Sequence, residues 1–174
     1  MPHLDDPDFA RSVTYVCEHT EDGAVGLVIN HPLPMLLPDI LSNMGIPHGE
    51  LTHITEPVYR GGPVRKERGF VLHSPTRKKW ESSIKLDDKL SITTSRDILE
   101  AIGKNKGPAH VIMALGYAGW GAGQLEAELA DNAWLCCPAD PEIFFNVPIT
   151  DRWRGAASLA GIKLEQLSLE AGHA

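Results

Sequence analysis

The sequence predicts an α/β protein with a mixed β-sheet and helices packed around it. Short segments rich in β-branched and aromatic residues, separated by turn residues, fill the first half of the chain, and this pattern is typical of hairpins. In the second half, strand-like and helix-like segments alternate, as they do where helices cross over a sheet. A length of 174 residues is ordinary for one domain, so we expect residues 1–174 to form a single domain.

Most of the expected strands lie in the first half. Residues 12–17 and 24–29 are predicted strands joined by a turn at Glu21-Asp22-Gly23. Pro38 and Gly45 fit the start and the end of a short helix over 39–44. Residues 57–59 lead into a sharp break at Gly61-Gly62-Pro63. The remaining expected features are a strand over 69–73 and a hairpin of 83–86 and 90–93 joined through Asp87-Asp88.

The second half is expected to begin with a helix that is capped at Thr94 and runs to about Ile102. Residues 111–115 are a continuous apolar run, which indicates a strand buried on both faces. They lead into a glycine-rich segment, 116–123, that we expect to be a loop. Further expected elements are a helix over 124–131 with Leu125 and Leu129 toward the core, a strand over 133–137, a helix from an Asp140 cap through 145, and a helix over 151–160 capped by Thr150.

In the last of these helices, Trp153 shares an apolar stripe with Ala156, Ala157 and Ala160. We therefore expect Trp153 to have a structural role.

Composition narrows the class of protein. The formal net charge is −7 and 43% of the residues are hydrophobic, as in a globular chain rather than a disordered one. No apolar run approaches the roughly 20 residues that span a bilayer, and the acidic start lacks the pattern of a signal peptide. Three cysteines, two of them adjacent, make no disulfide framework. We therefore expect a cytoplasmic protein with reduced thiols and no membrane partner.

Charge is distributed unevenly along the chain. Residues 60–106 carry twelve bases and six acids, whereas residues 1–59 carry one base and nine acids and residues 107–174 three bases and eight acids. The basic segment could meet the acids of the two ends, or it could form a basic face for nucleic-acid phosphates. Its clusters at 65–68 and 77–79 are expected in turns, and we find no helix-turn-helix pair with a basic recognition helix. We expect no specific nucleic-acid binding.

The glycine-rich segment is the first candidate site, because a loop between a buried strand and a helix can present backbone amides to an anion. It does not match a nucleotide fingerprint: the third glycine of G-x-G-x-x-G would fall on Gln124, and the lysine of a P-loop is missing. Two interpretations remain, a tight turn that packs aromatic side chains and a small anion or ligand site. The candidate residues are Gly116, Tyr117, Gly119, Trp120, Gly121 and Gln124.

Cys137 is the candidate reactive side chain. It is expected at a strand end, close to a helix N-terminus that would lower its pKa, although Asp140 would oppose that effect. It is either an inert buried thiol or a reactive, redox-sensing one. By fold analogy we expect the glycine-rich segment, residues 69–73 with His73, and Cys137 to meet around one concavity. No His or Cys spacing indicates a metal site, and no cofactor is expected.

A series of short motifs runs along nearly the whole chain. They are Asp6-Pro7-Asp8-Phe9, Ser12-Val13, Glu18-His19, the run 23–30, Gly61-Gly62-Pro63, the runs 68–73, 94–99 and 115–120, Gly123-Gln124-Leu125-Glu126, Asn132-Ala133-Trp134-Leu135, Pro138-Ala139-Asp140 and the end 171–174. Together they make the sequence similar to the AlgH/YqgE family of small bacterial proteins.

The resemblance implies a mixed sheet that is partly barrel-like or bifurcated and surrounded by short helices. It also implies a label, transcriptional regulator, attached to one branch of the family, while most members have no assigned activity. Family members usually carry an apolar strand before the position of Met1, so one sheet edge is expected to lack its partner.

Three functional hypotheses follow. The first is a non-enzymatic regulatory or binding module that acts through a protein or small-ligand contact, with any effect on transcription indirect, because the motifs lie in loops and at strand ends. The second is a thiol-based redox sensor or enzyme that uses Cys137. The third is direct DNA binding through residues 60–106.

Overall fold

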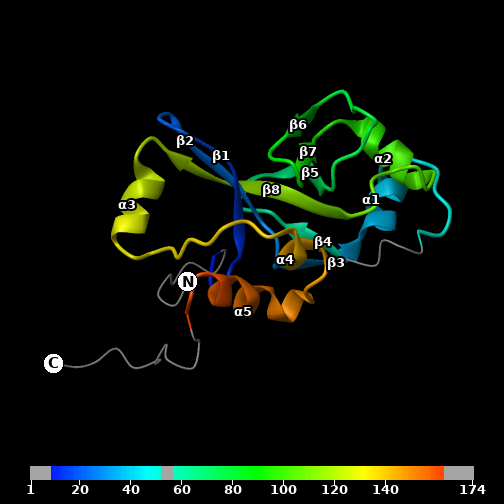
Figure 1. Ribbon diagram of the computed structural model, residues 1–174. Helices are drawn as coiled ribbons and strands as arrows, with labels where there is room; N and C mark the ends of the chain where they lie inside the picture. Colours follow the sequence, from blue (N-terminus) through cyan, green and yellow to red (C-terminus); the bar gives the residue numbers. More distant parts are fainter. Residues whose placement is uncertain (1–8, 52–56, 163–174) are drawn as a thin grey trace.

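The structure is a computed structural model that describes residues 9–51 and 57–162. A curled sheet lies at the centre, with helices at its ends and beneath it (Figure 1). In chain order the elements are β1 Thr14–Thr20, β2 Gly23–Val28, β3 Pro32–Leu36, α1 Leu37–Asn43, β4 Pro57–Arg60, β5 Val64–His73, β6 Ser83–Lys85, β7 Ser91–Thr93, α2 Arg96–Gly103, β8 Val111–Gly121, α3 Gln124–Ala130, α4 Pro141–Phe145 and α5 Ile149–Leu159.

Strand β8 organises the sheet. It pairs antiparallel with β5 through residues 111–117 and with β2 through residues 118–121, and it pairs parallel with β4 at residues 114 and 115. The main strand order is β1-β2-β8-β5-β7-β6, and β3 joins through β4. Because β8 has different neighbours along its length, the sheet divides and curls into a half-barrel. The predicted α/β class and the partly barrel-like, bifurcated sheet are confirmed.

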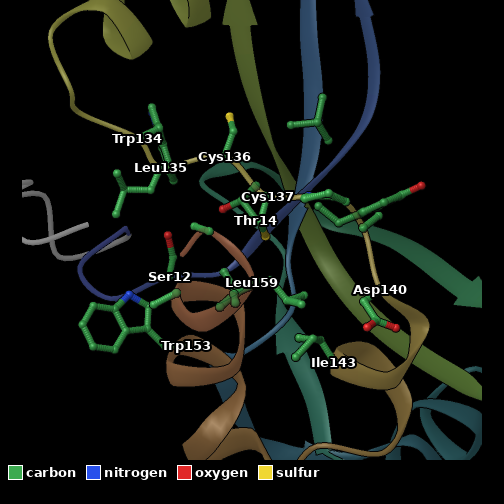
Figure 2. Close-up of a pocket in the computed structure, with 18 of the residues that line it drawn as sticks. Ser12, Thr14, Trp134, Leu135, Cys136, Cys137, Asp140, Ile143, Trp153 and Leu159 are labelled. Carbon is green, nitrogen blue, oxygen red and sulfur yellow. The ribbon is translucent and has the colours of Figure 1, made fainter. Parts of the chain in front are cut away.

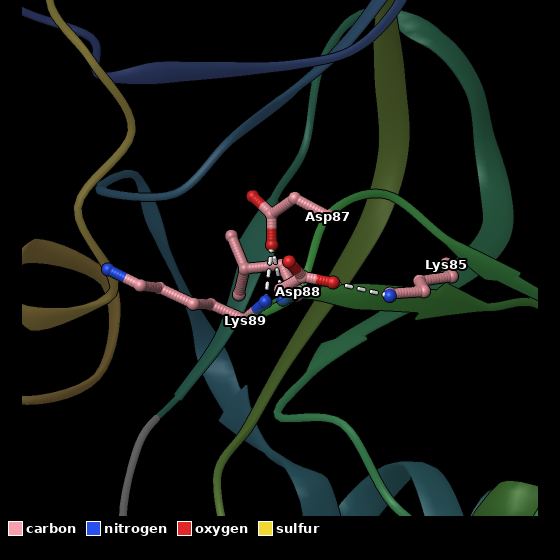
Figure 3. A network of polar contacts seen from close by, with 5 residues as sticks. Lys85, Asp87, Asp88 and Lys89 are labelled. Carbon is pink, nitrogen blue, oxygen red and sulfur yellow. Dashed lines mark hydrogen bonds and ion pairs between the residues drawn. The ribbon is translucent and has the colours of Figure 1, made fainter.

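Two predicted hairpins are present. Strands β1 and β2 pair around the turn at Gly23, with an irregularity between Val16 and Glu18. Strands β6 and β7 pair around Asp87, whose side-chain Oδ1 accepts hydrogen bonds from the backbone amides of Lys89 (2.6 Å) and Leu90 (2.7 Å) (Figure 3). Lys85 Nζ also lies 2.5 Å from Asp88 Oδ1, so the acidic pair closes the turn.

The glycine-rich segment is not a loop, and this prediction was wrong. Strand β8 continues to Gly121, so 116–121 lie in the sheet. Glycines in the connection between β4 and β5 allow it to pack closely against this part of β8. An added Cβ at Gly61 would lie 2.3 Å from the Gly116 carbonyl oxygen, and one at Gly62 would lie 2.1 Å from the Tyr117 carbonyl carbon. Gly116 itself has φ 73°, which favours glycine. The glycines therefore serve strand contact rather than anion binding.

Two other local predictions were also wrong, and one strand was not predicted. Residues 133–137 form no strand, and the strand β3 was not predicted because Pro32 and Pro34 argue against one. The basic cluster at 65–68 lies within β5, where the register shifts between Val64 and Gly69, and not in a turn.

The helices occur near their predicted positions, with differences at their first residues. Helix α2 is preceded by Ser95 rather than Thr94, and α5 begins at Ile149 after Pro148, so Thr150 is inside the helix instead of capping it. Helix α4 begins as predicted: Asp140 Oδ1 accepts a hydrogen bond from the Glu142 amide at 3.0 Å. No helix within the described residues is long and apolar enough to cross a membrane.

Apolar clusters cover both faces of the sheet, as the run at 111–115 predicts. Successive residues of β5 and β8 alternate between them. One cluster joins Val71 and Met113 to α1 and α2, and the other joins Leu72 and Ile112 to Phe144 of α4. A third, smaller cluster fixes α3 through Trp120 and Leu125. The third cluster and α5 create the space described next.

Candidate ligand-binding cavity

A cavity of ≈ 390 Å³ lies between β1, the segment 134–140 and helix α5. Figure 2 shows Ser12 and Thr14 between the chain at 134–137 and the helix that carries Trp153. Most of the lining is apolar. The described lining residues are 12–16, His19, Trp120, Leu125, Leu129, 134–140, Ile143, Phe144, Trp153, Ala156, Ala157, Leu159 and Ala160. A volume of this size is at the lower end of the range of small-molecule sites, about 300–1,000 Å³.

Small side chains on α5 leave this space open. Ala156, Ala157 and Ala160 share the face of α5 that also carries Trp153, and all four line the cavity. The predicted apolar stripe therefore exists, but it borders a cavity rather than a filled core. Trp153 is half-buried, and the guanidinium of Arg11 lies 5.9 Å from its ring centroid.

Two hydroxyl groups in the lining have no hydrogen-bond partner among residues 9–51 and 57–162. Ser12 and Thr14 are two residues apart, and their Oγ and Oγ1 atoms are buried and unpaired. Ser12 is only 7% exposed. A buried hydroxyl without a partner destabilises a folded protein by about 1–3 kcal/mol. The hydroxyl groups of Ser12 and Thr14 therefore remain able to form hydrogen bonds beside an apolar space.

One carboxylate holds the wall of the cavity formed by α3 and the chain after it. Glu128 Oε2 accepts hydrogen bonds from the indole nitrogens of Trp120 (2.9 Å) and Trp134 (2.7 Å), and its Oε1 accepts one from Gln124 Nε2 at 2.9 Å. The two indoles meet edge to face with centroids 5.7 Å apart. Burial raises the pKa of Glu128, but the hydrogen bonds from Trp134, Gln124 and Trp120 outweigh it and lower the pKa overall. Trp134 is thus held by side-chain contacts, and the Ala133 amide donates to the Glu128 carbonyl oxygen at 2.8 Å, so this segment is placed without a sheet.

The structure brings together only some of the predicted site residues. Trp120, Cys137 and Asp140 all line the cavity. The other candidates contact the sheet or α3 instead. Gly116 approaches the β4–β5 connection, Gly119 pairs with Val25, and the ring centroids of Tyr117 and Phe70 lie 5.8 Å apart. Gly121 donates its amide to Gln124 Oε1 at 3.0 Å, and Gln124 also contacts Glu128.

His73 does not reach the cavity. It is 1% exposed inside the sheet, where its ring contacts the Thr93 hydroxyl at 2.9 Å and the Ser74 carbonyl oxygen at 2.8 Å. Burial lowers the pKa of His73 below its usual 6.5. Its role in this geometry is to satisfy polar groups of β5 and β7.

The surroundings of Cys137 favour the inert thiol over the reactive one among its two interpretations. Burial, followed by the neighbouring Cys136, raises the pKa of Cys137 above its usual 9.0. Helix α4 is only five residues long, and its N-terminus is already capped by Asp140. Figure 2 shows the sulfurs of Cys136 and Cys137 on opposite sides of the chain, and only Cys136 is exposed. Burial likewise raises the pKa of Cys17 to about 12. These environments favour the thiol over the reactive thiolate.

Sequence reasoning missed Ser12, Thr14, Glu128 and Arg152. A serine and a threonine at alternate positions of a strand are too common to indicate a site. Glu128 shares one helix face with Gln124, and that spacing was the available signal for a contact between them. Arg152 is fully buried under the sheet, and nothing in the sequence distinguishes it from the exposed Arg154.

The fold and the cavity define an α/β protein with a half-barrel sheet and a ligand-sized apolar space beside its edge strand. The AlgH-like family model matches residues 1–165. A UPF0301 protein of Thioalkalivibrio sulfidiphilus is 52% identical over 174 residues, covering 100% of this chain and 92% of that protein. A UPF0301 protein of Vibrio cholerae is 47% identical over 178 residues, covering 100% and 95%. The chain belongs to the AlgH-like family.

Two solved structures resemble this fold. The solution structure of the AlgH protein from Pseudomonas aeruginosa matches with a TM-score of 0.78 and 47% identity, covering 100% of this chain and 92% of that one. The crystal structure of protein DIP2367 from Corynebacterium diphtheriae matches with a TM-score of 0.67 over 87% of this chain, at 21% identity, and shares the fold.

Proposed function

We propose that this protein is a non-enzymatic binding module whose cavity takes a small, mainly apolar molecule. The observation that supports this most is the combination of an apolar space of ≈ 390 Å³ with two buried, unpaired hydroxyls in its lining. Binding sites for small molecules are typically apolar, with a few polar groups that orient the ligand. An occupant would contact residues of β1, α3, α5 and the chain at 134–140 together.

A regulatory role follows from where the cavity lies. A bound molecule would contact Trp134 and the segment after it, which side chains hold in place without a sheet ladder. Ligand binding stabilises whichever arrangement of that segment it prefers, and a partner protein can read the resulting surface. Any effect on transcription would then be indirect. The thiol hypothesis gains no support, since the pKa of Cys137 is raised.

Native mass spectrometry tests the proposal with a variant that fills the cavity. The protein purified from its source cell should carry a small-molecule adduct that is lost on denaturation. Ala156→Phe places a ring in the cavity and should abolish the adduct, whereas Ser158→Phe, on the exposed side of α5, should retain it. Equal adducts on the two variants would show that the molecule binds elsewhere, and this would refute the proposal.

A further inference from the structure

We infer that the ligand of this cavity is an electrically neutral amphiphile, with one hydrogen-bonding head group at Ser12 and Thr14 and an aliphatic or aromatic body along α5 and the tryptophans. The inference rests on the proposed function and specifies the chemistry of the ligand. It depends on the two unpaired hydroxyls, on the charges around them and on the volume of the space.

The head group is placed by Ser12 and Thr14. Each hydroxyl can donate one hydrogen bond and accept others, so a single oxygen or amide group near both could bond to each. Because neither hydroxyl has a partner among the described residues, a ligand that supplies one gains these bonds without breaking any internal ones. Each oxygen is covered in the empty cavity, so its side chain must turn about the Cα–Cβ bond to meet the head group. Thr14 is the first residue of β1, and Ser12 lies two residues before it, on the other side of Val13.

The neutrality of the head group follows from the charged residues of the lining. Among the described lining residues none is Lys or Arg, and the ionisable groups besides the two thiols and Tyr15 are His19 and Asp140. Both already have partners: His19 Nε2 lies 2.7 Å from Glu126 Oε1, and Asp140 caps α4. A carboxylate taken into this space would lose its hydration without gaining an opposite charge. An ammonium group bound at Ser12 and Thr14 would lie apart from Asp140, the one carboxylate of the described lining, which Figure 2 shows away from both residues. Arg11 stacks on Trp153 but is itself exposed.

The size of the body follows from the volume. At about 30 Å³ for each water-sized group, a space of ≈ 390 Å³ holds about a dozen such groups. A chain of roughly eight to ten carbons with one polar atom fits this limit. Trp120, Trp134 and Trp153 border the space, so an occupant changes the environment of three of the four tryptophans of the chain.

The test compares three probes with one chain length: 1-octanol, octanoate and octylammonium, titrated at about pH 7.5, where the last two are charged. Binding is followed by tryptophan fluorescence. We expect 1-octanol to bind at least about tenfold more tightly than either ion. In the double variant Ser12→Ala, Thr14→Val we expect 1-octanol to lose about tenfold or more in affinity, and in Ser158→Ala, whose hydroxyl lies outside the cavity, to lose none.

The outcomes separate the two proposals. Octanoate or octylammonium binding as tightly as 1-octanol, or full affinity in the double variant, would overturn the neutral head group and leave the binding function standing. Failure of all three probes, together with no adduct on the protein from its source cell, would overturn both. The melting temperature of the ligand-free double variant should be unchanged or higher, since the lost hydroxyls had no partner. A large decrease would show that they are paired within the protein, and would also refute the inference.

Discussion

Arg152 should contribute more to stability than any exposed arginine of the chain. It is 0% exposed, and its guanidinium donates hydrogen bonds to the carbonyl oxygens of Ile29 (2.7 Å) and Val147 (3.1 Å) and to the Tyr59 hydroxyl (2.9 Å). It also stacks on the Tyr59 ring, 5.2 Å from its centroid. These contacts tie α5 to the ends of β2 and β4. Without Arg152, α5 loses its polar attachment to the sheet.

The Arg152→Ala substitution removes the three charge-assisted bonds described above and leaves the Ile29 and Tyr59 acceptors buried. At about 1.5–3 kcal/mol for each bond to a charged group, the free energy of unfolding should decrease by about 4 kcal/mol or more, out of a typical total of about 5–15 kcal/mol. Arg152→Lys retains the charge but not the planar fork, and should lose about half as much. Arg154→Ala, on the exposed side of the same helix, should change the free energy by less than about 0.5 kcal/mol.

Urea unfolding followed by far-ultraviolet circular dichroism measures these differences, with the dependence on urea concentration compared among variants to detect a change in mechanism. If Arg152→Ala were to lose no more stability than Arg154→Ala, the assignment of Arg152 as the polar anchor of α5 would be wrong. A folded Arg152→Lys with native spectra protects the test against the case in which Arg152→Ala does not fold.

Four further predictions concern single groups. Because the pKa of His73 is lowered in the folded protein, the unfolded chain binds a proton first as pH decreases. The free energy of unfolding should therefore fall as pH decreases from about 6.5 toward the folded-state pKa. His73→Asn should flatten this pH dependence when urea unfolding is repeated across the same range of pH. Glu128→Gln weakens the hydrogen bonds to both indoles, so the free energy of unfolding should decrease by about 1–2 kcal/mol and the tryptophan emission should change. An unchanged emission spectrum would contradict the role of Glu128 in holding the two indoles. With the other two cysteines replaced by serine, Cys137 should react with iodoacetamide at about pH 7.5 more slowly than free cysteine, and a faster rate would restore the thiol hypothesis. Binding to duplex DNA should be weak and vanish as salt rises to about 0.15 M, whereas a sequence-selective complex lost on Arg77→Glu would show direct DNA recognition.

The elements that sequence reasoning located best are those whose pattern is local. The β6–β7 hairpin follows from Asp87, since an Asp side chain can bond the amides of the turn that it begins. The start of α4 follows from the sequence Asp140-Pro141 in the same way. The buried strand at 111–115 follows from an unbroken apolar run, because such a run is stable only where both faces of a strand are covered.

Tertiary contacts account for the errors. The glycine-rich residues 116–121 resemble a loop in isolation, yet they belong to β8. The β4–β5 connection packs against them so closely that a Cβ atom on Gly61 or Gly62 would clash with the β8 backbone. Trp134 and Cys137 resemble a strand, yet their segment has no ladder partner among the described residues and is held through Glu128 instead. Local propensity could not anticipate the first contact, since Gly61 and Gly62 are far from β8 along the chain. It could not anticipate the second either, because a side-chain bond across the turn after α3 is not part of helix or strand propensity.

The sequence by itself determined the family, the α/β class, most strand and helix positions and the choice of Trp120, Cys137 and Asp140, because motif order and local periodicity are properties of the chain. Tertiary structure alone decided that these three border one cavity with Ser12 and Thr14, and that Cys137 has a raised rather than a lowered pKa. The physical reason is that burial, desolvation and the pairing of hydroxyls depend on which distant side chains surround a group. That environment forms only when β1, α3 and α5 pack together.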